Sequence, residues 1–268
     1  MANKYLARGD APFGDEVWSK LDEVVVSTAR SQLSGRRLLE VEGPYGLAVK
    51  SIPLHDELIS EGDVTLVSSA VIPVPLIEAG FTLTARDLAN FEKTGFSLHI
   101  EHIATAALKM AAAEDDLIFW GNADMGLHGL LNAPGTHKVK LGTWQEIGTA
   151  ANDVIQGLNA LDKAGFHGPY LLALAPELYN MLFRLYPQGY QTELQHVETA
   201  VGSHVIKAPG IKKGGVLLAA GKQFASIIVG QDMIAAFIGP AEHELEFKIT
   251  ESVAPRIRLA SAVCVLQA

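Results

Sequence analysis

Hydrophobic positions recur at helical spacing in two long stretches of the chain. Between Asp15 and Ser34 the apolar residues fall on one helical face, and Gly35 stands where a helix commonly ends. Between Ser97 and Trp120 a stripe rich in alanine and leucine has the same spacing, which at about 1.5 Å per residue gives a helix of over ~30 Å. The pattern therefore predicts an amphipathic opening helix and a long second helix, which we call the spine helix.

The part of the chain after Gly202 has the alternation of β-strands instead. Apolar runs bounded by turn residues lie at 204–207, 216–219, 225–229, 233–237, 245–253 and 257–267. Two earlier stretches, 43–52 and 64–72, have the same character.

A mainly helical insertion separates the spine helix from these strands. Thr143 and Glu146 have the spacing of a capping box for a helix that ends near Gly165. Two shorter helices, 176–185 and 192–201, are predicted on either side of a loop that contains Pro187, Gln188, Gly189 and Tyr190. The order of helix, strands, spine helix, helical insertion and strands favours an α+β fold over an alternating βαβ fold.

The segment from Leu54 to Gly95 is long and weakly patterned. Its apolar side chains have no obvious cover within the chain, so we expect an arm that packs against another subunit. The residues expected at that contact are Val71, Ile72, Leu76 and Phe81.

Composition supports extensive contact with other chains. Apolar residues make up 49% of the chain, but charged residues only 19%, against a usual ~25%. A membrane does not account for this deficit, because a spanning helix needs about 20 apolar residues and the longest uncharged stretch, 64–77, contains two prolines.

No signal peptide is evident, which predicts a cytoplasmic location without a membrane partner. The net charge of −9 argues against nucleic acid as a partner.

No set of residues has the spacing of an active site, so we predict no catalytic residue, no metal site and no cofactor. His99 and His102 are interpreted as surface or interface residues, and Cys264 as a buried thiol. The run 114–116, Glu-Asp-Asp, is interpreted as a charged turn of the spine helix, because no cationic partner is positioned by the sequence. A cytosolic hydrolase that uses a carboxylate and a histidine is the alternative of another class.

Several short motifs resemble those of the encapsulins, bacterial and archaeal shell proteins with the major capsid fold of tailed phages. They recur in family order over about residues 13 to 255. They are Gly35-Arg36-Arg37, Glu42-Gly43-Pro44-Tyr45-Gly46, Phe81-Thr82-Leu83, Glu114-Asp115 with Ile118-Phe119 and Gly121, Gly126 with Gly129-Leu130-Leu131, Gly165 with Gly168-Pro169-Tyr170, Val229-Gly230-Gln231-Asp232 and Ile249-Thr250-Glu251.

The resemblance implies a peripheral domain with the spine helix (1–53, 96–135 and 225–268), an extended arm (54–95) and an axial domain (136–224). It also implies a self-assembling icosahedral shell, a nanocompartment of about sixty copies, with pores for small molecules or ions. Such a shell encloses a cargo enzyme that carries a terminal targeting peptide. Family cargo includes ferritin-like proteins and dye-decolourising peroxidases, which suggests iron storage or defence against oxidative stress. A phage major capsid protein is the alternative with the same fold.

The resemblance also assigns roles to particular residues. The loop formed by Pro187, Gln188, Gly189 and Tyr190 is expected to border a pore at a symmetry axis. The cargo peptide is expected to bind between the opening helix and the strand after Asp232. The residues expected to contact it are Leu33, Arg36, Ile234 and Ala236. The alternative is that Leu33 and Ile234 are core residues.

Overall fold

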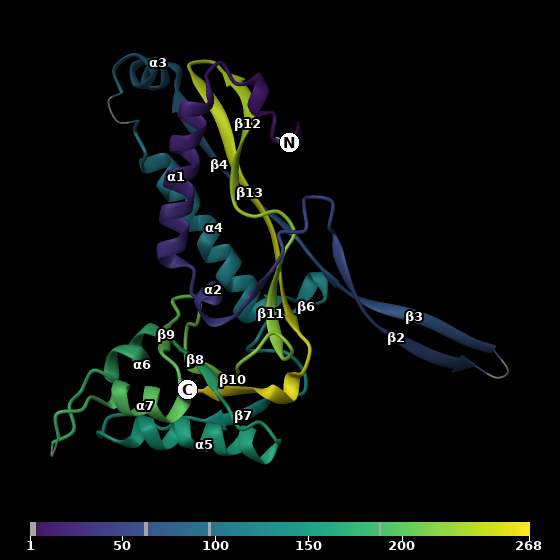
Figure 1. The fold of residues 1–268 in the computed structure, drawn as a ribbon, viewed down its shortest axis with the longest axis vertical. Coiled ribbons are helices and arrows are strands. Elements are labelled where there is room, and N and C mark those ends of the chain that lie inside the picture. Colours follow the sequence, from purple (N-terminus) through teal and green to yellow (C-terminus); the bar gives the residue numbers. More distant parts are fainter. Residues whose placement is uncertain (1–3, 62–63, 96–97, 188) are drawn as a thin grey trace.

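The computed structural model describes residues 4–61, 64–95, 98–187 and 189–268. They form an upper body with two long helices, a lower body around a second sheet, and a β-hairpin that projects from one side (Figure 1). The elements of the upper body are α1 (Asp15–Gln32), α2 (Gly35–Leu38), α3 (Ala85–Thr94), α4 (Glu101–Trp120), β1 (Val41–Glu42), β4 (Leu76–Thr84), β11 (Ala225–Val229), β12 (Ile234–Ala241) and β13 (Glu244–Ile257).

Strand β13 is the centre of the upper sheet. Its first half pairs with β12 on one side and β4 on the other, and its second half pairs with β11. Helices α1 and α4 bury their apolar faces against this sheet around Phe247, which is fully buried. The apolar face that the sequence predicts on each helix is the face that packs against the sheet. The prediction of both helices is therefore confirmed.

The lower body contains the helical insertion and the C-terminus. Its sheet has the order β7-β14-β10-β8-β9, and α5 and α7 pack beside it around the buried Trp144 and Leu172. The elements are β7 (His137–Lys140), α5 (Thr149–Lys163), β8 (Tyr170–Leu174), α6 (Pro176–Met181), α7 (Glu193–Val201), β9 (Val205–Lys207), β10 (Gly215–Ala219) and β14 (Val263–Gln267). Short elements elsewhere are η1 (Lys4–Leu6), η2 (Arg8–Asp10), β5 (Gly121–Asn122), η3 (Ala123–Met125), β6 (Leu127–His128) and η4 (Ala260–Ala262).

The predicted capping box at Thr143 and Glu146 is wrong. Helix α5 begins at Thr149, after Gly148 in the left-handed region, and no side chain caps it. The chain turns earlier, at the buried Trp144, whose φ is also positive. A capping box is present instead at the start of α7, where Thr192 and Gln195 satisfy each other's backbone N–H groups.

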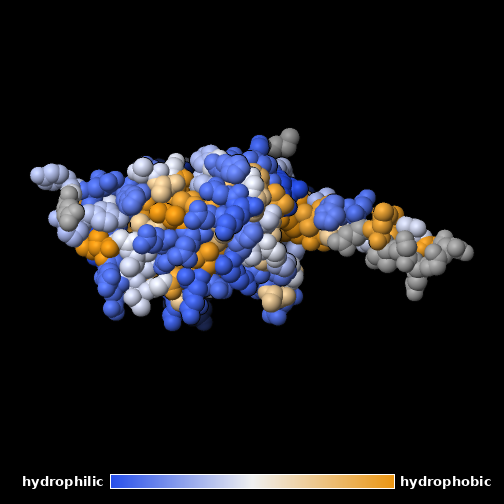
Figure 2. Space-filling view, turned by 90° about the horizontal axis from the view of Figure 1, so that it is seen from below, coloured by the Kyte–Doolittle hydropathy of each residue, from blue (hydrophilic) through white to orange (hydrophobic). Residues whose placement is uncertain are grey.

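The projecting hairpin consists of β2 (Ser51–Glu61) and β3 (Val64–Pro73). It extends far from both bodies, and hydrophobic side chains lie on its surface (Figure 1, Figure 2). The predicted strand over 43–52 is wrong for most of its length, since regular pairing begins only at Ser51. The rest of the predicted arm does not project from the upper body. Its strand β4 pairs with β13, and helix α3, capped by Thr84, follows β4.

Candidate functional sites

The exposed apolar surface of the hairpin is the first candidate site. Val71 is 55% exposed and Leu76 47%, whereas Ile72 is half-buried. The sequence analysis missed further members of this surface, which become evident only once the hairpin is seen to project. They are Leu58, Val64, Leu66 and Val67, each more than half exposed.

Phe81 does not belong to this surface. Its ring is buried and stacks on Phe247, with the centroids 5.1 Å apart. The expectation that Phe81 lacks cover within the chain is therefore wrong, because the strand that carries it is paired along its length with β13.

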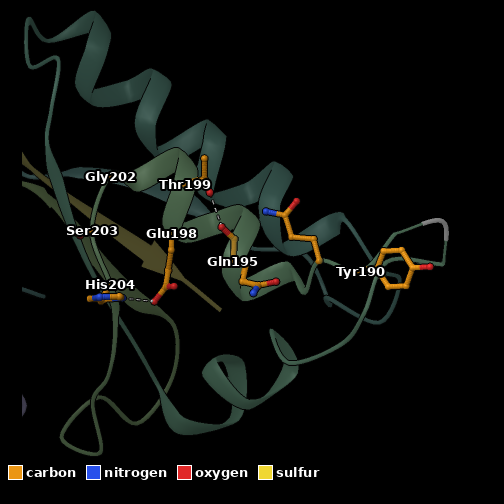
Figure 3. Close-up of a pocket in the computed structure, with 8 residues that line it drawn as sticks. Tyr190, Gln195, Glu198, Thr199, Gly202, Ser203 and His204 are labelled. Atoms are coloured by element: carbon orange, nitrogen blue, oxygen red, sulfur yellow. Dashed lines mark hydrogen bonds and ion pairs between the residues drawn. The ribbon is translucent and has the colours of Figure 1, made fainter.

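The second candidate site is an open hollow of about 850 Å³ beside α7 in the lower body. It is lined by Tyr190, Gln191, Gln195, Glu198, Thr199, Gly202, Ser203 and His204 (Figure 3). The carboxylate of Glu198 accepts a hydrogen bond from the backbone N–H of Val205, at 3.1 Å. The same oxygen lies 3.2 Å from Nδ1 of His204. The hollow is thus polar, with an acid and a histidine on one wall.

The loop predicted at a pore forms the far end of this hollow. Tyr190 is fully exposed and lies well away from His204 (Figure 3). Pro187 and Gly189 are exposed, while Gln188 lies outside the described residues. The structure thus places Tyr190 and Gly189 at the surface.

The third candidate site is a cavity of about 320 Å³ between the last turns of α1 and the segment before β12. Its wall contains Leu33 and Arg36, two of the residues expected to contact a cargo peptide. The full lining is Val26, Ala29, Arg30, Leu33, Arg36, Arg37, Asp232 and Met233. An apolar floor with a charged rim suits a short extended peptide that carries small apolar side chains.

The other two expected residues do not line the cavity. Ala236 is only 1% exposed, and Ile234 is half-buried. The N-terminal segment covers the edge of their strand, because Arg8 donates two hydrogen bonds to the carbonyl of Ala235, at 2.8 and 2.9 Å. The same guanidinium pairs with Asp22. The structure therefore brings Leu33 and Arg36 together but leaves Ala236 in the core.

Arg36 also reaches below the cavity, where it meets three carboxylates. Its Nε donates to Glu114 at 2.7 Å, and its Nη1 donates to Asp232 at 2.9 Å. Its Nη2 donates to Glu251. Glu114 and Glu251 are both fully buried, whereas the side chain of Asp232 is 57% exposed. We call Arg36, Glu114 and Glu251 the buried triad.

Asp115 fixes the position of α2, which carries Arg36. Its carboxylate accepts hydrogen bonds from the backbone N–H groups of Ser34 and Gly35 and from the Ser34 hydroxyl. A side chain at Gly35 would collide with Ile118, since an added Cβ would lie 2.5 Å from its Cδ1. A larger residue at this position would therefore force the Ile118 side chain to move, so glycine favours the close approach of α2 to α4.

The interpretation of residues 114–116 as a charged turn is wrong for Glu114 and Asp115 and correct for the exposed Asp116. The sequence could not identify the cationic partner, since Arg36 lies 78 residues before Glu114 and 215 before Glu251.

Burial dominates the electrostatics of the triad. It raises the pKa of Glu251 to about 9, and the neighbouring charge of Glu114 adds to the rise. Burial also raises the pKa of Glu114, although the hydrogen bond from Arg36 opposes this. For Arg36, burial favours the neutral form, but the hydrogen bond to Glu114 and the surrounding carboxylates outweigh it and raise its pKa.

Comparison with known proteins decides the family. Residues 3–254 match the family model described as encapsulating protein for peroxidase. The chain belongs to this family. It is a relative of the type 1 encapsulin shell protein EncA of Myxococcus xanthus, with 30% identity over 98% of this chain and 96% of EncA. The encapsulin resemblance seen in the sequence motifs is thereby confirmed, and the chain is an encapsulin shell protein.

Solved structures confirm the capsid fold. The virus-like particle protein from Pyrococcus furiosus superimposes with a TM-score of 0.76 over 94% of this chain and all of that one, at 21% identity. The capsid protein of the myovirus XM1 gives a TM-score of 0.62 over 87% of this chain and 91% of that one, at 13% identity. The α+β prediction and the tailed-phage capsid fold are therefore correct.

Cys264 and His99, the other reactive side chains considered from the sequence, do not lie in any of the three candidate sites. Cys264 is buried in β14, and burial raises the pKa of its thiol to about 11. His99 is exposed and lies 3.7 Å from Asp87. Within the described residues no three His, Cys, Asp or Glu side chains gather as metal ligands. In that same part of the chain, no helix has both the length and the apolar character needed to cross a membrane.

Proposed function

We propose that about sixty copies of this chain close into an icosahedral shell in the cytoplasm and that the β2–β3 hairpin supplies a main contact between them. The observation that carries the proposal is the exposed apolar surface of the hairpin. Isolated subunits would leave Leu58, Leu66 and Val67 in water on an element with little cover of its own. Burial against a neighbour gains about 1.5–3 kcal/mol for each such side chain.

The shell encloses a cargo enzyme that binds through a terminal targeting peptide at the cavity beside α1. Support comes from the apolar part of the lining, which is contributed by Ala29, Leu33 and Met233. The volume of about 320 Å³ accommodates a few small side chains rather than a folded domain. Many identical weak sites on one inner surface would retain a multimeric cargo through avidity.

The expected cargo is a peroxidase or a ferritin-like protein, which gives the shell a role in oxidative-stress defence or iron storage. Small substrates or ions enter through pores bordered by the Pro187–Tyr190 loop. A shell wall contributes containment and selective entry, so no chemical step is assigned to this chain.

Electron microscopy of the purified protein, with the ratio of its absorbance at 260 and 280 nm, tests the shell. We expect closed particles without nucleic acid. Particles that package DNA would favour the phage-capsid alternative, and a sedimentation profile of monomers only would refute assembly.

Co-expression with a reporter fused to the native targeting tail tests the cargo site. Val26→Asp places a charge in the cavity lining at a side chain that is 41% exposed, so it should abolish loading while shells persist. The matched control is Gln32→Asp, an exposed residue at the end of α1 that does not line the cavity. Equal loading of both variants would exclude the cavity as the cargo site.

A further inference from the structure

The buried triad has an imbalance of charge that its surroundings do not correct. Glu114 and Glu251 are both fully removed from water, yet a single guanidinium, that of Arg36, lies between them. Two ionised carboxylates beside one cation would leave a net negative charge in a low-dielectric site. Such a charge costs several kcal/mol unless it is paired or neutralised.

In the part of the chain that the structure describes, no other cation forms an ion pair with Glu114 or Glu251. Arg37, also on α2, donates to the backbone carbonyls of Leu33 and Lys207. On β13, Lys248 pairs with Glu78 of β4 at 2.6 Å. Ile77 of β4 stands opposite Glu251 in the register. Arg30 of α1 lies at the cavity rim and is exposed.

The remaining acids near the triad are stabilised by hydrogen bonds or by solvent. Asp115 is held by the N–H groups at the start of α2. Asp232 also accepts from Arg36, at 2.9 Å, but its side chain is 57% exposed, so water screens its charge. The excess charge is therefore confined to Glu114 and Glu251.

The oxygen atoms of the pair show how the excess is removed. One oxygen of each carboxyl group accepts from Arg36, and Oε2 of each is buried without another hydrogen-bonding group among the described residues. Both carboxyl groups accept from the same guanidinium, which holds them side by side. A proton between them would satisfy both groups and make the buried triad neutral.

We infer that Glu114 and Glu251 share one proton, and that this protonated acid pair positions Arg36 in the cavity wall and joins α4 to β13 beneath it. The proton belongs to the pair rather than to either residue. Its removal at alkaline pH leaves two like charges side by side, which weakens the joint between the spine helix and the sheet. The inference concerns the folded subunit and does not depend on cargo binding.

The infrared spectrum of the assembled protein tests this inference directly. At pH 7 the wild type should show the carbonyl band of a protonated carboxylic acid, and the band should fall as the pH rises through about 9. Glu251→Gln should remove the band, because the amide can hydrogen-bond to Glu114, which then ionises against Arg36. Glu114→Gln should remove it for the same reason. Glu246→Gln, an exposed change on the same strand, and Asp116→Asn, an exposed change on α4, should leave it intact.

Absence of the band from the wild type at pH 7 would overturn the inference, and this measurement needs no variant to fold. A band that persists in both Glu114→Gln and Glu251→Gln would also overturn it, because the proton would then reside elsewhere. Loading of the tailed reporter is a separate measurement. If loading fails while the band behaves as described, the proposed cargo site is wrong and the acid pair stands.

Discussion

Phe81 of β4 lies flat against Phe247 of β13, with the ring planes only 10° apart and the centroids separated by 5.1 Å. Phe247 also contacts Trp18 of α1 edge to face, so the stack links β4, the strand after the hairpin, to the core of the upper body. The stack therefore anchors β4 in the core of the upper body, and the exposed apolar hairpin precedes that strand in the chain.

Phe81→Ala should destabilise the subunit itself. Removal of a buried aromatic ring typically costs about 3–5 kcal/mol, through lost burial and the cavity left behind. Denaturant unfolding of the variant, followed by tryptophan fluorescence, measures this loss. A change of less than about 1 kcal/mol would mean that the stack does not anchor the strand.

The double substitution Val67→Asp and Val71→Asp should impair assembly of the shell rather than stability of the subunit. Both side chains are more than half exposed and lie on one face of β3, so charges there should leave the subunit folded but prevent closure of the shell. Size-exclusion chromatography and circular dichroism separate the two properties. Ser68→Asp, on the other face of the strand, is the matched control. Normal shells from the double variant would show that this face is not a contact.

Stability should depend on pH through Glu251. Its pKa is raised from 4.5 to about 9 in the fold, so the folded state binds a proton that the unfolded state has released. The stabilising contribution is complete below about pH 4.5 and is lost as the pH rises to about 9, by at most about 1.4 kcal/mol per pH unit.

Glu251→Gln should reduce the loss of stability with rising pH. The stability of the variant relative to the wild type should therefore increase as the pH rises from 5 to 9. Thermal unfolding of both proteins in a series of buffers measures the difference, with Glu246→Gln as the control. Parallel curves for the wild type and Glu251→Gln would contradict a linked proton.

Tyr190→Ala should speed the entry of small molecules into a loaded shell. The side chain is fully exposed in the subunit, so its removal should not alter folding, and electron microscopy checks that the shell still closes. The rate at which an enclosed enzyme consumes an external substrate measures entry. Tyr45→Ala, an exposed tyrosine in the upper body, is the control. Equal rates for both variants would place the pore elsewhere.

The sequence by itself determined the elements whose pattern is local. The apolar periodicity of 15–34 and 97–120 identifies α1 and α4, because one face of each helix is buried over its whole length. Most C-terminal strands followed from alternation and turn residues, and the ordered motifs identified the family. Leu33 and Arg36 could be assigned to the cavity only through that resemblance.

Tertiary structure decided the features that depend on distant partners. Glu114 has the sequence context of a surface acid, and only the approach of Arg36 and Glu251 makes it a buried one. Phe81 similarly looks like an arm residue until β4 pairs with β13. Local spacing determines which face of an element a residue occupies. Whether that face meets water, a core or an opposite charge depends on segments far away in the chain.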